Sequence, residues 1–149
     1  MTAERLFSLL NMITIAAWLP LVLLPRARWA KAMVPVVIPS LLAVVYAALV
    51  IWTFPRSEGS FASLGGVKTL FDNQWALLAG WTHYLAFDLF VGGWEARDAQ
   101  RRGISHLLVV PVLVLTFLFG PVGFLLYIAI RSSVRTRVER EPLRGEVVR

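Results

Sequence analysis

Long apolar stretches alternate with short polar connections along the chain. Four stretches contain no Lys or Arg and cover residues 6–24, 33–54, 75–93 and 107–130. Each is long enough to cross a hydrocarbon core, which takes about 20 helical residues. Because backbone groups in lipid must be bonded internally, and alternating strands of ~10 residues are absent, we expect helices. The pattern predicts an all-α membrane protein, a four-transmembrane-helix bundle with short connections that forms one domain over residues 1–131.

The segments outside these stretches predict two further features. Residues 132–149 form a basic tail that we expect to be flexible. Residues 56–74 are the longest connection, and their Ser and Gly content is typical of a loop. Within that connection, apolar residues recur at helical spacing and predict a short amphipathic turn at the membrane interface: Phe61, Leu64, Val67, Leu70 and Phe71.

Composition agrees with a membrane protein. Of the 149 residues 58% are hydrophobic, and the mean hydropathy is +0.69, whereas soluble domains are nearer 45–50% apolar. The sequence contains no cysteine, which excludes disulfides, thiolate nucleophiles and thiolate metal ligands. The first apolar stretch is longer than a signal-peptide core and no small-residue cleavage site follows it, so we expect it to be retained as a span.

Charge suggests where the chain lies in the membrane. The net charge is +6, and basic residues are frequent in the tail; we expect the tail to contact anionic lipid headgroups. No aromatics are interleaved with these arginines, so nucleic acid is not an expected partner. Four spans would place both termini on one side, and a count of nine basic residues against six favours cytoplasmic termini. The flanks of the first span favour the reverse. The use of 13 Arg against 2 Lys is typical of a GC-rich bacterium, which predicts a multi-pass protein of the inner (cytoplasmic) membrane.

The third stretch contains two ionisable residues, His83 and Asp88. Such groups cost about 2.5–3.5 kcal/mol each at a bilayer centre, so they seldom occur there without a role. They are five residues apart, roughly 140° around an ideal helix, and therefore do not share a face. Asp88 and Glu95 differ by only about 20°. We expect His83 and Asp88 to have partners on other spans, with Asn11 and the break at residues 120–123 as candidates.

Three interpretations of these polar residues stay open. A metal ion could be held by His83, Asp88, Asp98 and His106, although no diagnostic ligand spacing is present. A buried carboxyl and imidazole could instead act as general acid and base, with Asp98 as a further catalytic candidate. The third interpretation is structural, with interhelical hydrogen bonds. An antiparallel fourth span would place His106 beside Asp98 and Glu95, and the 120–123 break beside His83.

Other residues add to the candidate site or offer simpler explanations. Glu95 and Asp98 could pair with Arg101 or Arg102 on a solvated helix end, and for Glu95 we favour this interpretation. The Gly-Pro-Val-Gly sequence at 120–123 predicts a kink that opens a cavity. The candidate binding residues are polar, aromatic or kink-forming: Asn11, Trp81, Tyr84, Thr116, Gly120 and Pro121.

The sequence resembles a known family at these residues. The run from Trp81 to Gly92, together with Asp98, His106 and the Phe-Gly-Pro-Val-Gly sequence at 119–123, is similar to the abscisic-acid-deficient protein four family. Plant members are chloroplast membrane proteins needed to make neoxanthin from violaxanthin, an isomerisation that opens an epoxide to an allene. The resemblance covers roughly residues 6–131.

This resemblance implies a small four-helix membrane protein that acts on carotenoids. It makes His83, Asp88 and Asp98 functional candidates in an isomerase that acts on, or a protein that binds, a carotenoid or another isoprenoid. Bacteria generally lack neoxanthin, so the plant substrate need not apply to this chain. The alternative is a non-catalytic membrane scaffold or assembly factor for a lipid or pigment enzyme. The sequence does not identify a cofactor, and a metal ion is the one candidate.

Overall fold

The computed structural model describes residues 2–24, 27 and 33–134, and this part of the chain is helical without strands. The elements are α1 (Ala3–Leu23), the π-helical turn η1 (Met33–Val37), α3 (Ile38–Thr53), the 3₁₀ turn η2 (Phe54–Arg56), α4 (Leu64–Asp72), α5 (Gln74–Arg102), α6 (His106–Phe119) and α7 (Pro121–Ser133). The prediction of an all-α fold is confirmed. The basic connection at 28–31 and most of the predicted tail lie outside the described residues.

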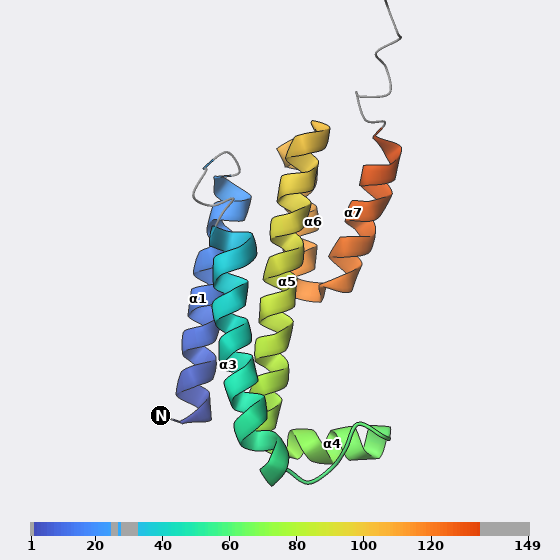
Figure 1. The fold of residues 1–149 in the computed structure, drawn as a ribbon. Helices are drawn as coiled ribbons and strands as arrows, with labels where there is room; N and C mark the ends of the chain where they lie inside the picture. Colours follow the sequence, from blue (N-terminus) through green and yellow to red (C-terminus); the bar gives the residue numbers. More distant parts are fainter. Residues whose placement is uncertain (1, 25–26, 28–32, 135–149) are drawn as a thin grey trace, which may run out of the picture.

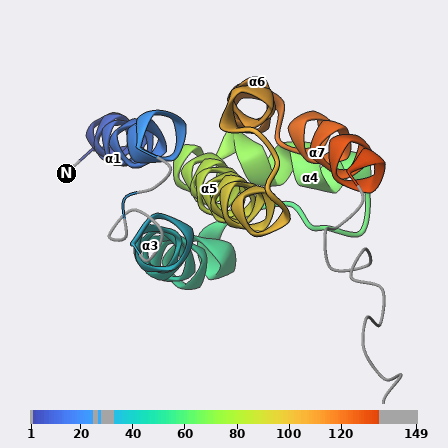
Figure 2. The ribbon, with the colours of Figure 1, turned by 90° about the horizontal axis from the view of Figure 1, so that it is seen from above.

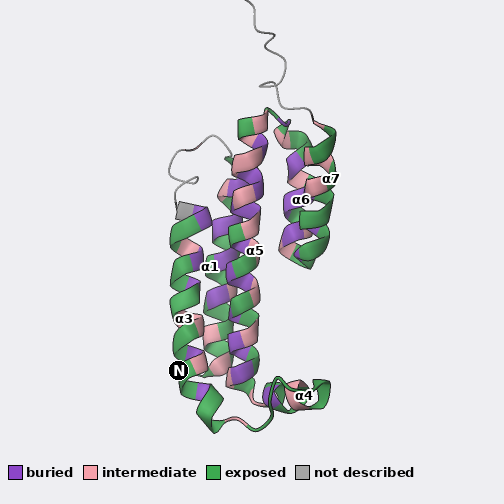
Figure 3. Cartoon of the chain, turned by 45° about the vertical axis from the view of Figure 1, so that its right-hand side comes forward, coloured by how far each residue is buried: buried purple, intermediate pink, exposed green. Residues whose placement is uncertain are grey.

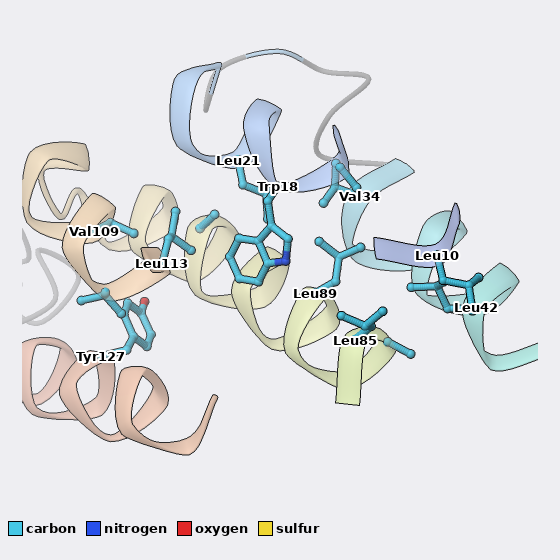
Figure 4. Close-up of a cluster of buried hydrophobic side chains, with 14 of the residues drawn as sticks. Leu10, Trp18, Leu21, Val34, Leu42, Leu85, Leu89, Val109, Leu113 and Tyr127 are labelled. Carbon is cyan, nitrogen blue, oxygen red and sulfur yellow. The ribbon is translucent and has the colours of Figure 1, made fainter. Parts of the chain in front are cut away.

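Helix α5 is the central element of the fold. It packs against α1 and α3 on one side and against the α6–α7 pair on the other (Figures 1 and 2). The core follows this arrangement: Trp18 of α1 and Leu89 of α5 meet near the middle, and Val109, Leu113 and Tyr127 fill the side toward α7 (Figure 4). Exposed positions cover much of the outer faces of α1, α3 and α7 (Figure 3).

Two helices are long and apolar enough to cross a membrane, judged by length and composition. They are Ala3–Leu23 and the continuous run Val34–Arg56 through η1, α3 and η2. Helix α5 has 29 residues and is therefore about 43 Å long, but its polar side chains lower its hydropathy. It extends past the predicted span of 75–93 by more than two turns.

Helix α4 extends sideways from the end of α5, transverse to the long helices and away from α1 and α3 (Figure 1). The Ser63 hydroxyl accepts from the Gly66 amide and caps its N-terminus, while Asn73 ends α4 and caps α5. Leu70 of α4 is buried, whereas Leu64 is 86% exposed. The predicted amphipathic turn is therefore a helix of nine residues.

The fourth predicted span is not one helix. The chain reverses at Gly120, where φ is +33° and ψ is −90°, and α6 and α7 run back to back as a helical hairpin (Figure 1). Pro121 then starts α7 at a position where its missing N–H costs no hydrogen bond. The two helices have 14 and 13 residues, or about 20 Å each, too short to cross a bilayer core of ~30 Å. The prediction of a single kinked helix over 107–130 is wrong, and the bundle of four spanning helices is not confirmed.

The hairpin determines where α7 ends. Helix α1 begins at the end of the molecule near α4, and α7 finishes at the opposite end, near the α5–α6 turn (Figure 1). The expectation that both termini share one side counts residues 107–130 as one crossing, whereas the structure divides this segment into two antiparallel helices.

Candidate functional site at the helical hairpin

Three acidic residues of α5 face the hairpin. Asp88, Glu95 and Asp98 are separated by seven and three residues, which places them along one side of a helix. Asp88 contacts the turn of the hairpin, Glu95 its middle and Asp98 the end of α7. The predicted common face of Asp88 and Glu95 is confirmed. The α6–α7 hairpin thus covers a line of carboxyl groups.

Asp88 lies against the turn at Gly120. A Cβ at residue 120 would lie 2.6 Å from Asp88 Oδ1, so the carboxylate occupies space that only glycine leaves free. Asp88 is fourteen residues from either end of α5, at the middle of the helix. Its Oδ2 atom is buried and has no hydrogen-bond partner among the described residues. An acid is thus held at mid-helix with one oxygen available.

Tyr84, one turn before Asp88, adds a hydroxyl to this place. Its hydrogen is donated to the Phe117 carbonyl oxygen, 2.9 Å away, near the end of α6. The hydroxyl also lies close enough to Asp88 to interact with it. A phenol has a single hydrogen, so donation to Phe117 leaves the carboxylate without it. Tyr84 can donate to Asp88 only by giving up its hydrogen bond to Phe117.

Glu95 is fully buried between α5 and α6. Its relative exposure is 0%, and the Thr116 hydroxyl lies 2.9 Å from one carboxyl oxygen and 3.2 Å from the other. The single hydroxyl hydrogen can satisfy one of them. Gly123 of α7 packs directly on Thr116, which closes the site from the other side. The expected solvated pairing of Glu95 with Arg101 or Arg102 is wrong, because the hairpin covers this face.

Asp98 holds the open end of the hairpin. Its Oδ2 accepts from Tyr127 Oη at 2.7 Å, from Arg102 Nε at 2.8 Å and from Arg131 Nε at 2.9 Å. Partial burial alone would raise the pKa of Asp98, but the three hydrogen bonds and the charge of Arg102 outweigh it, so the pKa lies below its usual value. The predicted pairing with Arg102 is confirmed, and Asp98 is a structural anchor between α5 and α7.

His83 does not join Asp88. It is exposed on another side of α5, where its ring stacks on Phe87 at 4.6 Å and contacts the Tyr46 ring of α3 at 5.4 Å. The prediction that the two residues do not share a face is confirmed. The expectation that the 120–123 break lies beside His83 is wrong, since the turn lies beside Asp88.

His106 also differs from expectation. Its Nε2 lies 2.7 Å from the Val22 carbonyl oxygen, so the start of α6 is tied to the end of α1 and not to Asp98. Among the described residues no group of three or more His, Asp or Glu side chains could hold a metal ion. The four proposed ligands, His83, Asp88, Asp98 and His106, are therefore not brought together in one centre.

Asn11 and Trp81 form a separate contact between α1 and α5. Trp81 Nε1 donates to Asn11 Oδ1 at 3.2 Å, and the Asn11 amide donates to the Phe7 carbonyl. Trp81 also contacts the Tyr84 ring at 5.2 Å, and it lies about two helical turns before Asp88. Asn11 is a partner of Trp81 and not of His83.

The described cavities do not coincide with these polar groups. One of about 300 Å³ lies between α3 and α5. Its apolar lining includes Pro35, Phe87 and Phe90, but not Asp88. This cavity and the hairpin lie on different sides of α5. We therefore take the contact between Asp88 and Gly120, and not the cavity, as the candidate functional site.

Two residues of this site are not predicted from the sequence. The sequence favours a solvated Glu95, although its spacing from Asp88 places both on one face, and it does not indicate a role for Tyr127. The available signal for Tyr127 was a polar hydroxyl four residues before Arg131 in an apolar segment. Neither could be recognised without knowing that the chain turns back at Gly120.

The fold and the site define a class: a helical protein of membrane type in which a short hairpin covers acids on a long central helix. The chain belongs to the ABA DEFICIENT 4-like family, whose model matches residues 5–127. The match includes α1 to α6 and most of α7, with all three acids. No curated protein and no solved structure matches the chain.

Proposed function

We propose that the protein is an integral membrane protein with three crossings and one re-entrant hairpin. The crossings are α1, the run from η1 to η2, and α5 from Trp75 to Gly93, so that Asp98 lies beyond the crossing; α6 and α7 enter the bilayer and return. Apolar side chains on the outer helix faces, such as Ile51 at 74% and Val44 at 68% exposure, favour contact with lipid over water. Membership in the ABA DEFICIENT 4-like family supports the same placement.

Three crossings also give an orientation. The end of α5 and the end of α7 lie together, while the start of α1, η2 and α4 lie at the other end (Figure 1). By their positions in these elements, four basic residues belong to the first end and three to the second: Arg97, Arg101, Arg102 and Arg131, and Arg5, Arg56 and Lys68. By sequence, three more basic residues follow α1 and five follow Val134, so three crossings would put twelve of the fifteen on one side of the membrane. The excess of basic residues marks the cytoplasmic side. We therefore place the C-terminus in the cytoplasm and the N-terminus on the other side of a bacterial inner membrane. The basic residues that flank the first span favour the same orientation.

The hairpin turn is the proposed site of function: it binds a carotenoid or another isoprenoid and isomerises it by proton transfer at Asp88. The observation that carries this proposal is the buried, unpartnered Asp88 Oδ2 at the middle of α5. Apolar side chains at and near the turn, including Phe119 at 60% and Val122 at 55% exposure, offer an entry from lipid. Polar residues within membrane helices mark functional sites by default.

A single carboxyl group can supply both proton transfers of an isomerisation. Protonated Asp88 would donate its proton to an epoxide oxygen or a polyene carbon, and the resulting carboxylate would remove a proton from another carbon of the same molecule. The enzyme returns to its starting protonation state and no cosubstrate is consumed. His83, expected as the base, is not required because it lies on another side of α5.

The test compares two matched Asp→Asn substitutions in cells that lack the native gene. Asp88→Asn changes the site, whereas Asp72→Asn changes an exposed aspartate at the end of α4. With equal amounts of protein in the membrane, we expect only Asp72→Asn to restore the isoprenoid and pigment profile of wild-type cells. Restoration by Asp88→Asn would refute catalysis by Asp88 and favour the scaffold alternative.

A further inference from the structure

A seam between α5 and α7 combines aromatic rings with basic groups. On α5, Trp94, Asp98 and Arg102 recur every four residues and so lie on one face. On α7, Phe124 and Arg131 are seven residues apart on one face. The Trp94 and Phe124 rings are 6.0 Å apart, and both guanidinium groups meet at Asp98. The seam therefore changes from apolar to basic toward the end of the molecule.

The basic end of this seam has a surplus of charge and of donors. Two arginines share one carboxylate oxygen, which leaves a net charge of +1. Each guanidinium bonds Asp98 through Nε, and its terminal nitrogens provide further donors. The side chains of Arg102 and Arg131 are 22% and 36% exposed, so an anion can reach them. Asp98 thus holds the two guanidinium groups close together through their Nε atoms and leaves their terminal nitrogens as donors for an anion.

We propose that this seam binds the phosphate of an anionic phospholipid, with an acyl chain against Trp94 and Phe124. Paired guanidinium groups match the planar, multidentate bonding of phosphate oxygens. The aromatic pair toward the hairpin turn supplies the apolar contact that a free phosphate would not use. This inference rests on the proposed membrane placement but not on catalysis by Asp88.

The test uses purified full-length protein in detergent and counts bound lipids by native mass spectrometry. Phosphatidylglycerol, phosphatidylcholine and inorganic phosphate are added separately. We expect wild-type protein to retain phosphatidylglycerol over phosphatidylcholine, and Arg131→Gln to bind it about fivefold more weakly, since one basic residue near an anionic surface contributes about 1 kcal/mol. Equal retention by wild type and Arg131→Gln, or equal retention of both lipids, would overturn the proposal. Displacement by millimolar inorganic phosphate would also overturn it, because the site would then bind free anions.

Two further variants separate lipid binding from folding. Arg56→Gln removes a basic residue at the opposite end and should leave retention unchanged. Asp98→Asn keeps a carbonyl oxygen that can accept from both arginines but removes the negative charge that repels an anion. It should therefore lower thermal stability and yet retain phosphatidylglycerol at least as strongly as wild type. A parallel loss of stability and lipid binding in Asp98→Asn would show that Asp98 merely holds the fold and would contradict the proposed site.

Discussion

The contact between Gly123 and Thr116 gives a prediction in which the sign of the effect is decisive. A Cβ at residue 123 would overlap the backbone nitrogen and the hydroxyl of Thr116, and helix backbone cannot move aside locally. Overpacking of this kind costs about 1–3 kcal/mol, while alanine gains roughly 0.5–1 kcal/mol over glycine inside a helix. Because the overlap includes backbone, the cost lies in the upper part of this range, at about 2–3 kcal/mol. We therefore expect Gly123→Ala to lower the free energy of unfolding by about 1–2.5 kcal/mol.

Gly65→Ala is the matched control. Gly65 is exposed in α4 and a Cβ there would meet nothing within 4 Å, so this variant should be unchanged or up to about 1 kcal/mol more stable. The assay is reversible unfolding in mixed detergent micelles, followed by circular dichroism. If residues 107–130 formed one lipid-facing helix, Gly123→Ala would be stabilised like the control. That result would refute the hairpin packing.

Two other predictions concern the acids of α5. Thr116→Val deprives the buried Glu95 carboxyl of its described donor, so unfolding in the same assay should show a loss of about 1–3 kcal/mol; an unchanged stability would mean that Glu95 has another partner. The pKa of Asp98 is lower in the folded than in the unfolded protein. Its contribution to stability is therefore fully present above the unfolded pKa of about 3.9, and it is lost as the pH falls through the folded pKa. Asp98→Asn should lower stability at neutral pH and flatten the acid side of the pH–stability profile. A profile parallel to that of wild type would contradict the anchoring role.

The apolar segments predicted much of the fold because hydropathy and length determine where helices can form in lipid. The first span agrees with α1 to within about a turn, and the interfacial turn agrees with α4. The segment 107–130 is predicted as one helix because the residues on both sides of Gly120 are apolar. Glycine and proline at 120–121 fit a kink as well as a reversal, and only tertiary contacts of Gly123 with Thr116 distinguish the two.

The candidate site was predictable only in part for the same reason. Helical spacing correctly predicted that His83 and Asp88 lie on different faces of α5 and that Asp88 and Glu95 share one. Both predictions depend on the geometry of α5 alone. The partners of these residues depend on the hairpin, so the burial of Glu95 and the bond from Tyr127 to Asp98 could not be deduced. His106 was misplaced because its partner is a backbone carbonyl at Val22, which side-chain types do not reveal.

Membrane sidedness of the two chain ends tests the hairpin and the three crossings most directly. The native chain has no cysteine, so Glu4→Cys and Ser133→Cys each introduce a single thiol at an exposed position. In intact spheroplasts treated with a membrane-impermeant maleimide, we predict labelling of Glu4→Cys, and labelling of Ser133→Cys only after permeabilisation. Labelling of both cysteines from the same side would contradict the re-entrant hairpin and restore an even number of crossings.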